Sequence, residues 1–180
     1  MTIEYIAVDK LPKTYYDGVK RLLVLTDEEF FPPLSVRSGT TQSDFHPDEP
    51  DYSAGGDSIT LYFQALLKQS FILAVADGEI AGFLSYIRNH VADGVDISPE
   101  NAYVSTICVA PAHRRRGIAS TFYDKLEADE RIPFVFTRTW GQNDSHIYLL
   151  KRRDYEKIAE FADDRATGVD TVYYAKKMGD

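Results

Sequence analysis

A short basic run followed by glycine is the part of the sequence best suited to binding a small anion. His113, Arg114, Arg115 and Arg116 stand directly before Gly117. Guanidinium groups donate charge-assisted hydrogen bonds to phosphate oxygens, and each well-formed contact is worth roughly 1.5 to 3 kcal/mol. Glycine has no Cβ, so a ligand can approach the backbone closely there. The run therefore predicts a site for a small phosphorylated ligand.

The elements expected on either side of this run support the same interpretation. The apolar run at 103–109, closed by Pro111, predicts a strand, and Ile118, Phe122 and Leu126 recur every four residues and predict a helix. The first amides of a helix have no intrahelical acceptor, and the aligned peptide dipoles place roughly +0.5 charge there. A phosphate group is therefore expected at the start of this helix.

The segment from Ile107 to Ala119 resembles the signature of the GNAT superfamily of N-acyltransferases. That signature is an apolar strand and Val-x-Pro, followed by Arg/Gln-x-x-Gly-x-Gly/Ala, and this chain reads Ile-Cys-Val-Ala-Pro-Ala-His-Arg-Arg-Arg-Gly-Ile-Ala. The resemblance extends from the hairpin at 77–83 to Tyr155, whereas residues 1–70 match only in element order. It implies an acetyl-CoA-dependent N-acetyltransferase that transfers acetyl by direct attack of an amine and needs no metal.

The resemblance also implies which residues hold acetyl-CoA. The backbone of Ile107 and Val109 is expected to pair with the pantetheine arm as an added strand would. The pyrophosphate is expected to lie against seven successive residues: Arg114, Arg115, Arg116, Gly117, Ile118, Ala119 and Ser120. Asn143, which follows the next strand, is expected to face the cofactor as well.

This chain differs from the family's pattern at the residue that would protonate the departing CoA thiolate. Family members commonly carry a tyrosine on the helix seven residues after the position of Asn143, and here that residue is Leu150. His146 lies four residues before Leu150 and therefore on the same helical face, whereas Tyr148 is turned about 200° from that face. His146 is the better-placed candidate acid and Tyr148 the chemically more familiar one. Helix capping or packing is the alternative role for His146, and core packing for Tyr148.

A second proton must leave the attacking amine, because a lysine-like amine with a pKa of about 10.4 is mostly protonated at neutral pH. Tyr103 and Ser105 on the central strand and Glu79 in the hairpin are candidates for this proton route, although ordinary strand and surface positions also explain them. Cys108 is interpreted as a small buried residue rather than a nucleophile, because no histidine or asparagine is arranged near it in the sequence.

The loop between Pro32 and Asp57 is acidic and has no sustained periodicity. It contains His46 together with Asp44, Asp48, Glu49, Asp51 and Asp57. These carboxylates could recruit a cationic amine, but a run of charges is usually solvated surface, and their spacing matches no known metal site. Arg165, near the C-terminus, is a further candidate for the substrate side.

Residue patterns along the whole chain predict a mixed α/β (α+β) protein. Apolar runs predict strands at 2–8, 71–76, 79–86, 103–109, 134–140, 155–161 and 171–177, with a tight Asp77-Gly78 turn joining the second to the third. Helical spacing predicts helices at 12–30, 58–70, 117–130 and 145–153. With the resemblance, this indicates the GNAT fold, a mostly antiparallel sheet of six or seven strands flanked by about four helices.

Composition narrows the class of protein further. The chain has 180 residues, a formal net charge of −8 and a pI near 5.0. We expect a single N-acetyltransferase domain over residues 1–180. The acidic balance argues against nucleic-acid binding, because neutralising phosphates requires an extended basic surface. Cys108 is the only cysteine, which excludes an intramolecular disulfide and a cysteine zinc cluster.

The expected setting is the cytoplasm, without membrane contact, because no stretch approaches the roughly 18 apolar residues of a membrane span. The expected acceptor is a small-molecule amine or a peptide amine, and the expected state a monomer or homodimer. A different function remains open, because Leu150 replaces the family's tyrosine. The chain could be a catalytically weak acyl-CoA sensor or interaction module with the same fold.

Overall fold

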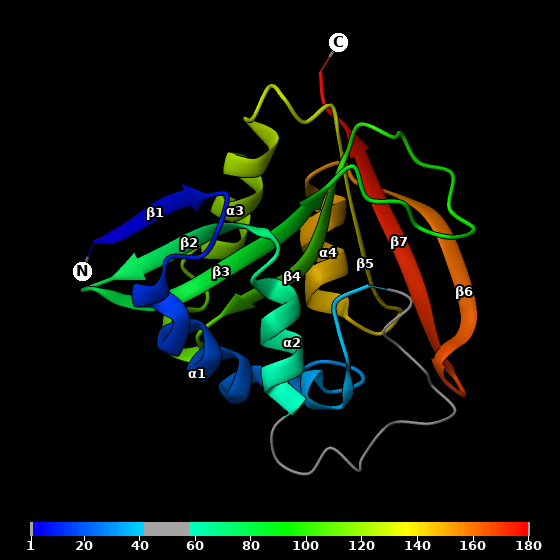
Figure 1. Ribbon diagram of the computed structural model, residues 1–180. Coiled ribbons are helices and arrows are strands. Elements are labelled where there is room, and N and C mark those ends of the chain that lie inside the picture. Colours follow the sequence, from blue (N-terminus) through cyan, green and yellow to red (C-terminus); the bar gives the residue numbers. More distant parts are fainter. Residues whose placement is uncertain (1, 42–57, 180) are drawn as a thin grey trace.

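Figure 1 shows the computed structural model of the chain, which describes residues 2–41 and 58–179. Its centre is a seven-stranded sheet with the strand order β1-β2-β3-β4-β5-β7-β6. Neighbouring strands are antiparallel except β4 and β5, which run parallel. This arrangement confirms the expected α/β fold with a mostly antiparallel sheet.

The strands lie where alternating or continuous apolar residues predicted them. They are β1 (Ile3–Val8), β2 (Ser70–Ala76), β3 (Glu79–Arg88), β4 (Ala102–Val109), β5 (Phe134–Trp140), β6 (Glu156–Ala166) and β7 (Val169–Lys177). The main difference is β6, which continues five residues past its expected end at residue 161. It continues because its hairpin with β7 closes only at Gly168, whose φ is 77°.

The helices also lie at the predicted segments. They are α1 (Tyr16–Thr26), α2 (Ser58–Leu66), α3 (Ile118–Glu127) and α4 (Asp144–Arg152). Of these, α1, α2 and α3 are shorter than predicted, and α4 has the predicted length but is shifted by one residue. The helix expected over 12–30 is divided, because 3-10 turns at Lys13–Tyr15 and Asp27–Glu29 flank α1. Among the described residues, no helix combines the length and apolar character needed to cross a bilayer.

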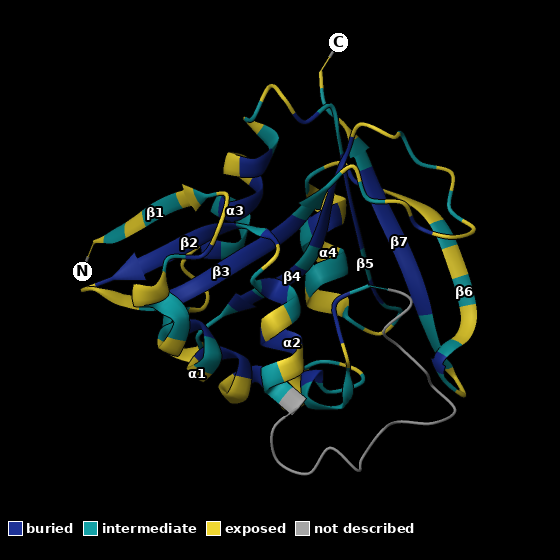
Figure 2. Cartoon of the chain, viewed as in Figure 1, coloured by how far each residue is buried: buried dark blue, intermediate teal, exposed yellow. Residues whose placement is uncertain are grey.

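Helices cover both faces of the sheet, and the side chains of β2 alternate between the two layers. Ile72 and Ala74 belong to a core that includes residues of α3 and α4, whereas Phe71 and Leu73 belong to a core that includes residues of α1 and α2. Strands covered on both faces need apolar residues at every position. Figure 2 accordingly shows β2 almost entirely buried.

The sheet divides between its two parallel strands. β4 and β5 are paired over three residues only, from Ala102 opposite Val135 to Val104 opposite Thr137. Beyond that point β4 stays with β3 as far as Val109, and β5 stays with β7 as far as Trp140. The two strands therefore separate as a wedge, and backbone edges that would normally pair with each other face the gap.

Candidate active site

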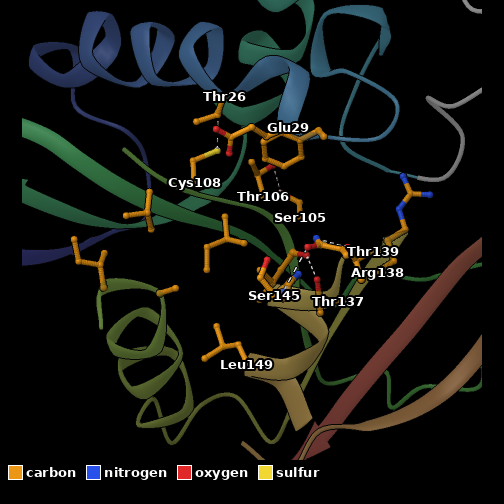
Figure 3. Close-up of a pocket in the computed structure, with 18 of the residues that line it drawn as sticks. Thr26, Glu29, Ser105, Thr106, Cys108, Thr137, Arg138, Thr139, Ser145 and Leu149 are labelled. Atoms are coloured by element: carbon orange, nitrogen blue, oxygen red, sulfur yellow. Dashed lines mark hydrogen bonds between the residues drawn. The ribbon is translucent and has the colours of Figure 1, made fainter. Parts of the chain in front are cut away.

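A cleft with a volume of about 480 Å³ lies at the wedge between β4 and β5. Its walls are the separated ends of both strands, the first turn of α3, the start of α4 and part of the segment from Thr26 to Thr40. Figure 3 shows the side chains of Cys108 on β4 and Arg138 on β5 within this space. The cleft therefore unites segments from much of the chain, including the basic run that the sequence singled out.

The start of α3 presents unpaired backbone amides to the cleft. Gly117 precedes the helix with a φ of 76°, and the first helical hydrogen bond runs from the Thr121 N–H to the Gly117 carbonyl at 2.9 Å. The amides of Ile118, Ala119 and Ser120 precede that bond, and all three residues line the cleft. Apart from Gly117 itself and the adjoining main chain, no atom of the described residues lies within 4 Å of a Cβ built at Gly117, so there is room for an anion at this point.

Most of the residues predicted to contact acetyl-CoA line the cleft. They are Ile107, Val109, Arg114, Arg115, Gly117, Ile118, Ala119, Ser120 and Asn143. Arg116 is the exception, since it does not line the cleft. The basic run thus provides two of its three arginines to this space.

One edge of β4 faces the cleft with backbone groups in position for pairing. The Ala110 N–H donates to the Ala81 carbonyl of the neighbouring strand segment at 2.9 Å. Hydrogen-bonded and non-hydrogen-bonded positions alternate in an antiparallel pair, so the backbone groups of Val109 and Ile107 point away from β3. Arg114 Nε donates to the Val109 carbonyl at 3.0 Å. The Val109 N–H and both backbone groups of Ile107 remain oriented toward the gap.

Asn143 both lines the cleft and caps α4. Its side-chain oxygen accepts from the His146 N–H at 3.4 Å, and its amide nitrogen donates to Thr139 Oγ1 at 2.9 Å. Asparagine is a favoured N-cap residue because its side chain satisfies an otherwise unpaired helical amide. Asn143 therefore fixes the start of α4 against β5.

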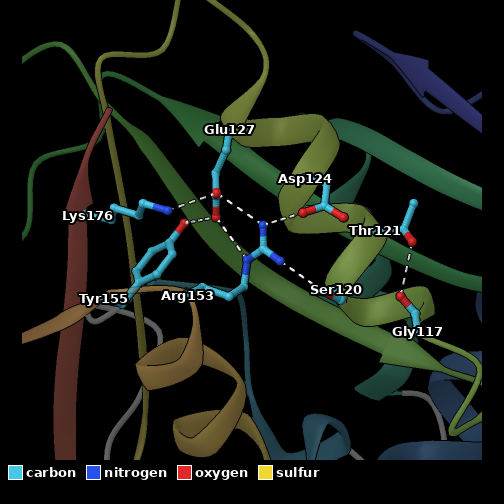
Figure 4. Close-up of polar contacts among 8 residues, drawn as sticks. All are labelled: Gly117, Ser120, Thr121, Asp124, Glu127, Arg153, Tyr155 and Lys176. Atoms are coloured by element: carbon cyan, nitrogen blue, oxygen red, sulfur yellow. Dashed lines mark hydrogen bonds and ion pairs between the residues drawn. The ribbon is translucent and has the colours of Figure 1, made fainter. Parts of the chain in front are cut away.

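A cluster of charges around Arg153 fixes α3 to the rest of the protein (Figure 4). The guanidinium, just past the end of α4, donates to Ser120 Oγ at 2.8 Å and to carboxylates of Asp124 at 2.6 Å and Glu127 at 3.0 Å. Glu127 also accepts from Lys176 of β7 at 3.1 Å. Because Ser120 is in the first turn of α3, this network holds that turn in place.

His146 lines the cleft, and its Nε2 lies 2.9 Å from the hydroxyl of the buried Tyr123. Burial lowers the pKa of His146 to about 4, so its imidazole is neutral at pH 7. A neutral imidazole can donate or accept a hydrogen bond, but only the protonated imidazolium can act as a general acid. No local pattern in the sequence identifies Tyr123 as its partner, because the two residues are on different helices.

The structure does not bring the other acid candidate to the cleft. Tyr148 is 63% exposed, does not line the cleft, and its ring lies 5.8 Å from Arg152 Cζ. The alternative of a core position for Tyr148 is wrong for the same reason. Leu150, at the position of the family's tyrosine, is fully buried in the core with Tyr123. The structure thus places His146 and not Tyr148 at the cleft, in agreement with the helical spacing that made His146 the better-placed candidate.

The candidates for the proton route are divided between the cleft and the surface. Tyr103 and Ser105 line the cleft, but Ser105 already donates to Gln69 Oε1 at 2.5 Å. Glu79 is outside, where it pairs with Arg21. Glu29, which the sequence did not single out, is the only carboxylate among the described lining residues, and it accepts from Arg114 at 2.6 Å. The acidic loop residues and His46 lie outside the described residues.

Cys108 is a buried thiol without activation. Burial raises its pKa to about 12, and Thr26 Oγ1 lies 3.7 Å from Sγ. A thiol with so high a pKa contains almost no thiolate at pH 7. The interpretation of Cys108 as a small buried residue is therefore confirmed.

Solved structures of the same fold cover nearly the whole chain. An aminoglycoside 6'-acetyltransferase type Ii matches with a TM-score of 0.67 and 16% identity, over 100% of this chain and 99% of that one. Arabidopsis thaliana NAA60, in complex with a bisubstrate analogue, matches with a TM-score of 0.63 and 15% identity, over 99% of each chain. Because these identities are low, the matches establish the shared fold alone.

A third structure shares part of the fold. It comes from Bacillus anthracis, is described as a candidate streptothricin acetyltransferase and contains acetyl coenzyme A. It matches with a TM-score of 0.52 and 14% identity, over 62% of this chain and 63% of that one. No curated protein sequence matches this chain.

A family model gives the more specific assignment. The model of the acetyltransferase (GNAT) family matches residues 38–155. This range includes the strands that form the wedge, the amides at the start of α3, and all of α4. Because the match covers well over half of the chain and includes all of these elements, the protein belongs to the GNAT acetyltransferase family.

Proposed function

We propose that this protein transfers the acetyl group of acetyl-CoA to a primary amine. The observation that carries the proposal is that an anion-binding helix start and an open strand edge face the same cleft. A pyrophosphate and a peptide-like arm are the two parts of CoA that need such partners. The related structure with bound acetyl coenzyme A supports this choice of ligand.

In this proposal, the amides of Ile118, Ala119 and Ser120 bind the pyrophosphate, with Arg114 and Arg115 adding charge. The helix dipole favours an anion at the same point. The amide groups of pantetheine pair with the Val109 N–H and the backbone of Ile107, which completes the open edge of β4. The thioester that acetyl-CoA supplies is thereby held beside β5 and the start of α4.

The amine nitrogen then forms a bond with the thioester carbonyl carbon, while the carbon–sulfur bond breaks and the amine loses a proton. Glu29 is the proton acceptor that the described lining residues offer, directly or through water. We propose that His146 orients the reacting groups as a neutral imidazole. A thiol with a pKa near 8.5 departs tolerably as thiolate, so the reaction can proceed without a charged acid.

The alternative is an acyl-CoA sensor with the same fold. The observation that favours it is the burial of Leu150 in place of a tyrosine near the cleft. A sensor needs the binding site but not a proton route. The two functions therefore share their cofactor site and differ in turnover.

Thiol release from acetyl-CoA, measured with a panel of amines and with mass detection of the acetylated product, tests the proposal. We expect product with at least one amine and simple saturation by acetyl-CoA. Tight binding of acetyl-CoA by calorimetry, with no product from any amine, would favour the sensor instead.

A further inference from the structure

Three arginines from separate parts of the chain line the cleft in addition to those of the basic run. Arg37 follows the 3-10 turn at Leu34–Val36, Arg138 is on β5, and Arg165 is on β6. Arg37 donates to the Pro32 carbonyl at 2.6 Å and Arg165 to the adjacent Phe31 carbonyl at 2.6 Å. Two guanidinium groups therefore converge on one short turn. We call Arg37, Arg138 and Arg165 the arginine cluster.

Aromatic rings hold the cluster in place. The Cζ atom of Arg37 is 5.9 Å from the centre of the Phe30 ring, and that of Arg165 is 5.9 Å from the Trp140 ring. The two rings are 6.3 Å apart. Arg138 Nε donates to the hydroxyl of Tyr103 at 3.0 Å. These neighbours orient the cations without neutralising them, because aromatic rings and a phenol carry no negative charge at pH 7.

The cluster has no matching anion among the described residues, where none of the ion pairs involves Arg37, Arg138 or Arg165. Two acidic groups act on it, Asp27 and Asp164, and neither forms a direct ion pair with a cluster arginine. Both oxygens of Asp27 accept from Ser35, at 2.7 and 2.6 Å. Asp164 accepts from Thr171 Oγ1 at 2.6 Å, and this hydroxyl accepts from Arg165 Nε at 3.0 Å, so one hydroxyl separates the carboxylate from the guanidinium.

The charges in the cluster also oppose one another. Arg165 is 7% exposed. Burial and the nearby charges of Arg37 and Arg138 lower its pKa to about 9, which still leaves it protonated at pH 7. Buried like charges are unfavourable unless an anion joins them. In a chain of net charge −8, their accumulation in one cleft points to a ligand.

The anion that the cluster would bind is not the pyrophosphate of CoA. That group has its own partners at the start of α3, where Arg114 and Arg115 line the cleft. The arginine cluster instead comes from β5, β6 and the residue after the 3-10 turn at Leu34–Val36, whereas Arg114 and Arg115 stand directly before α3. A separate set of cations fits a second anion, carried by the other substrate.

We propose that the arginine cluster binds an oxyanion, a carboxylate or a phosphate, carried by the acceptor molecule together with its amine. The inference rests on the proposed acetyl transfer and names its acceptor class: an anionic amine such as an amino acid or an aminoalkyl phosphate. Planar guanidinium groups bind carboxylate and phosphate through paired hydrogen bonds. Nearby guanidinium charge also favours the neutral amine, which is the attacking form.

Matched acceptor pairs test this proposal. Each of a set of free amino acids is compared with its amide, and O-phosphoethanolamine with ethanolamine, by thiol release at fixed acetyl-CoA. We expect kcat/KM to be about 10- to 100-fold higher for the anionic member of the preferred pair. The amino acid and phosphate arms identify which oxyanion is used. Equal rates for both members of every pair, or faster reaction of the uncharged member, would overturn the proposal and leave acetyl transfer intact.

Variants show whether the cluster itself is responsible. Arg37→Gln and Arg138→Gln are expected to raise KM for the anionic acceptor about 10- to 100-fold and to leave the Kd of acetyl-CoA unchanged. Arg21→Gln, which removes an exposed arginine outside the cleft, is the matched control and should change neither value. Reduced thermal stability with unchanged acceptor KM would show that the cluster is structural, and the proposal would be wrong.

A binding measurement distinguishes this proposal from the proposed function. Calorimetry is carried out with protein saturated with CoA, titrated with the same amino acids, amides and phosphates. Anion binding that Arg37→Gln weakens, without turnover of any amine, would support the cluster and reject acetyl transfer. The absence of anion binding would reject the cluster, whatever the outcome of the thiol-release assay.

Discussion

Gly117 carries the main chain from the basic turn into α3 at a φ of 76°. Residues with a Cβ adopt this region only with strain. Gly117 lines the cleft, and beyond the adjoining main chain no described atom lies within 4 Å of an added Cβ. A side chain at Gly117 would therefore find room in the protein and occupy the space that the proposed pyrophosphate needs.

We expect Gly117→Glu to weaken CoA binding at least about 100-fold, through steric conflict and repulsion between carboxylate and phosphate. Gly78→Glu is the matched control, because Gly78 also has a positive φ of 83° with open space around it but is in the β2–β3 turn outside the cleft. Both variants should lose similar stability, and calorimetry with CoA should detect a defect only in the first. Equal CoA affinity in the two variants would place the pyrophosphate elsewhere.

His146 supports a prediction about pH. Its pKa in the folded protein, about 4, is below the usual value of about 6.5. The unfolded chain therefore binds a proton more readily, so the stability that the neutral imidazole contributes is complete above pH 6.5 and is lost as the pH falls toward 4. The loss is about 3 kcal/mol at most, at about 1.4 kcal/mol per pKa unit.

Denaturant unfolding of the wild type and His146→Gln between pH 4 and 7.5 measures this contribution. We expect the wild type to lose more stability than the variant over this range, and the kcat profile to show no His146 ionisation near neutral pH. A kcat that falls with a pKa of 6 to 7 in the wild type and not in the variant would contradict the neutral imidazole.

At the scale of elements, the charged side chains around Arg153 stabilise the position of α3. The side chains of Arg153 and Glu127 are 13% and 14% exposed, so removal of one partner leaves a poorly solvated charge. We expect Arg153→Met to lower the free energy of unfolding by about 3 kcal/mol and to weaken CoA binding by misplacing Ser120. Arg21→Met, at an exposed pair with Glu79, should change neither quantity in the same measurements of urea unfolding and CoA affinity. A destabilised Arg153→Met protein with full CoA affinity would separate this network from the cofactor site.

The elements around the cofactor site could be predicted because their signals are local. The apolar run that ends at Val109, the positive-φ glycine and the four-residue spacing of Ile118, Phe122 and Leu126 lie within one short stretch. Helix ends were less predictable, because 3-10 turns at Lys13–Tyr15 and Asp27–Glu29 adjoin α1 on both sides, and the spacing of the apolar residues does not show where regular helical bonds stop.

Contacts between distant elements could not be read in the same way. The arginine cluster joins residues 37, 138 and 165 only after the sheet has formed, and Tyr123 meets His146 from another helix. Arg138 has the one charged side chain of β5, in the sequence Phe-Val-Phe-Thr-Arg-Thr-Trp. A cation within an apolar strand was the signal available, but its partners are not encoded nearby.

At the scale of the whole molecule, the charge of the cleft is opposite to that of the chain. The net charge is −8, yet the described cleft residues include five arginines and one carboxylate: Arg37, Arg114, Arg115, Arg138, Arg165 and Glu29. Such a contrast concentrates anionic ligands at the positive region. It also explains why the overall composition gave no indication of an anion site.

We propose that residues 1–180 form one domain, because the two largest apolar cores lie on opposite faces of the same sheet and share strands β2 and β3. We expect a single cooperative unfolding transition in urea. Circular dichroism and tryptophan fluorescence from Trp140, the only tryptophan, should give coincident curves. Separate midpoints for the two signals would indicate parts that unfold independently.

The short junction between β4 and β5 has a mechanical consequence. In the part of the chain that the structure describes, three paired residues are the only ladder that joins the β1–β4 half of the sheet to the β5–β7 half. A pantetheine arm lying along the gap would bridge the two halves of the sheet and shield the Ile107 and Val109 amides from hydrogen exchange. Cofactor loading would then stiffen the protein far from the reacting atoms, and the two halves would become free to flex each time CoA departs.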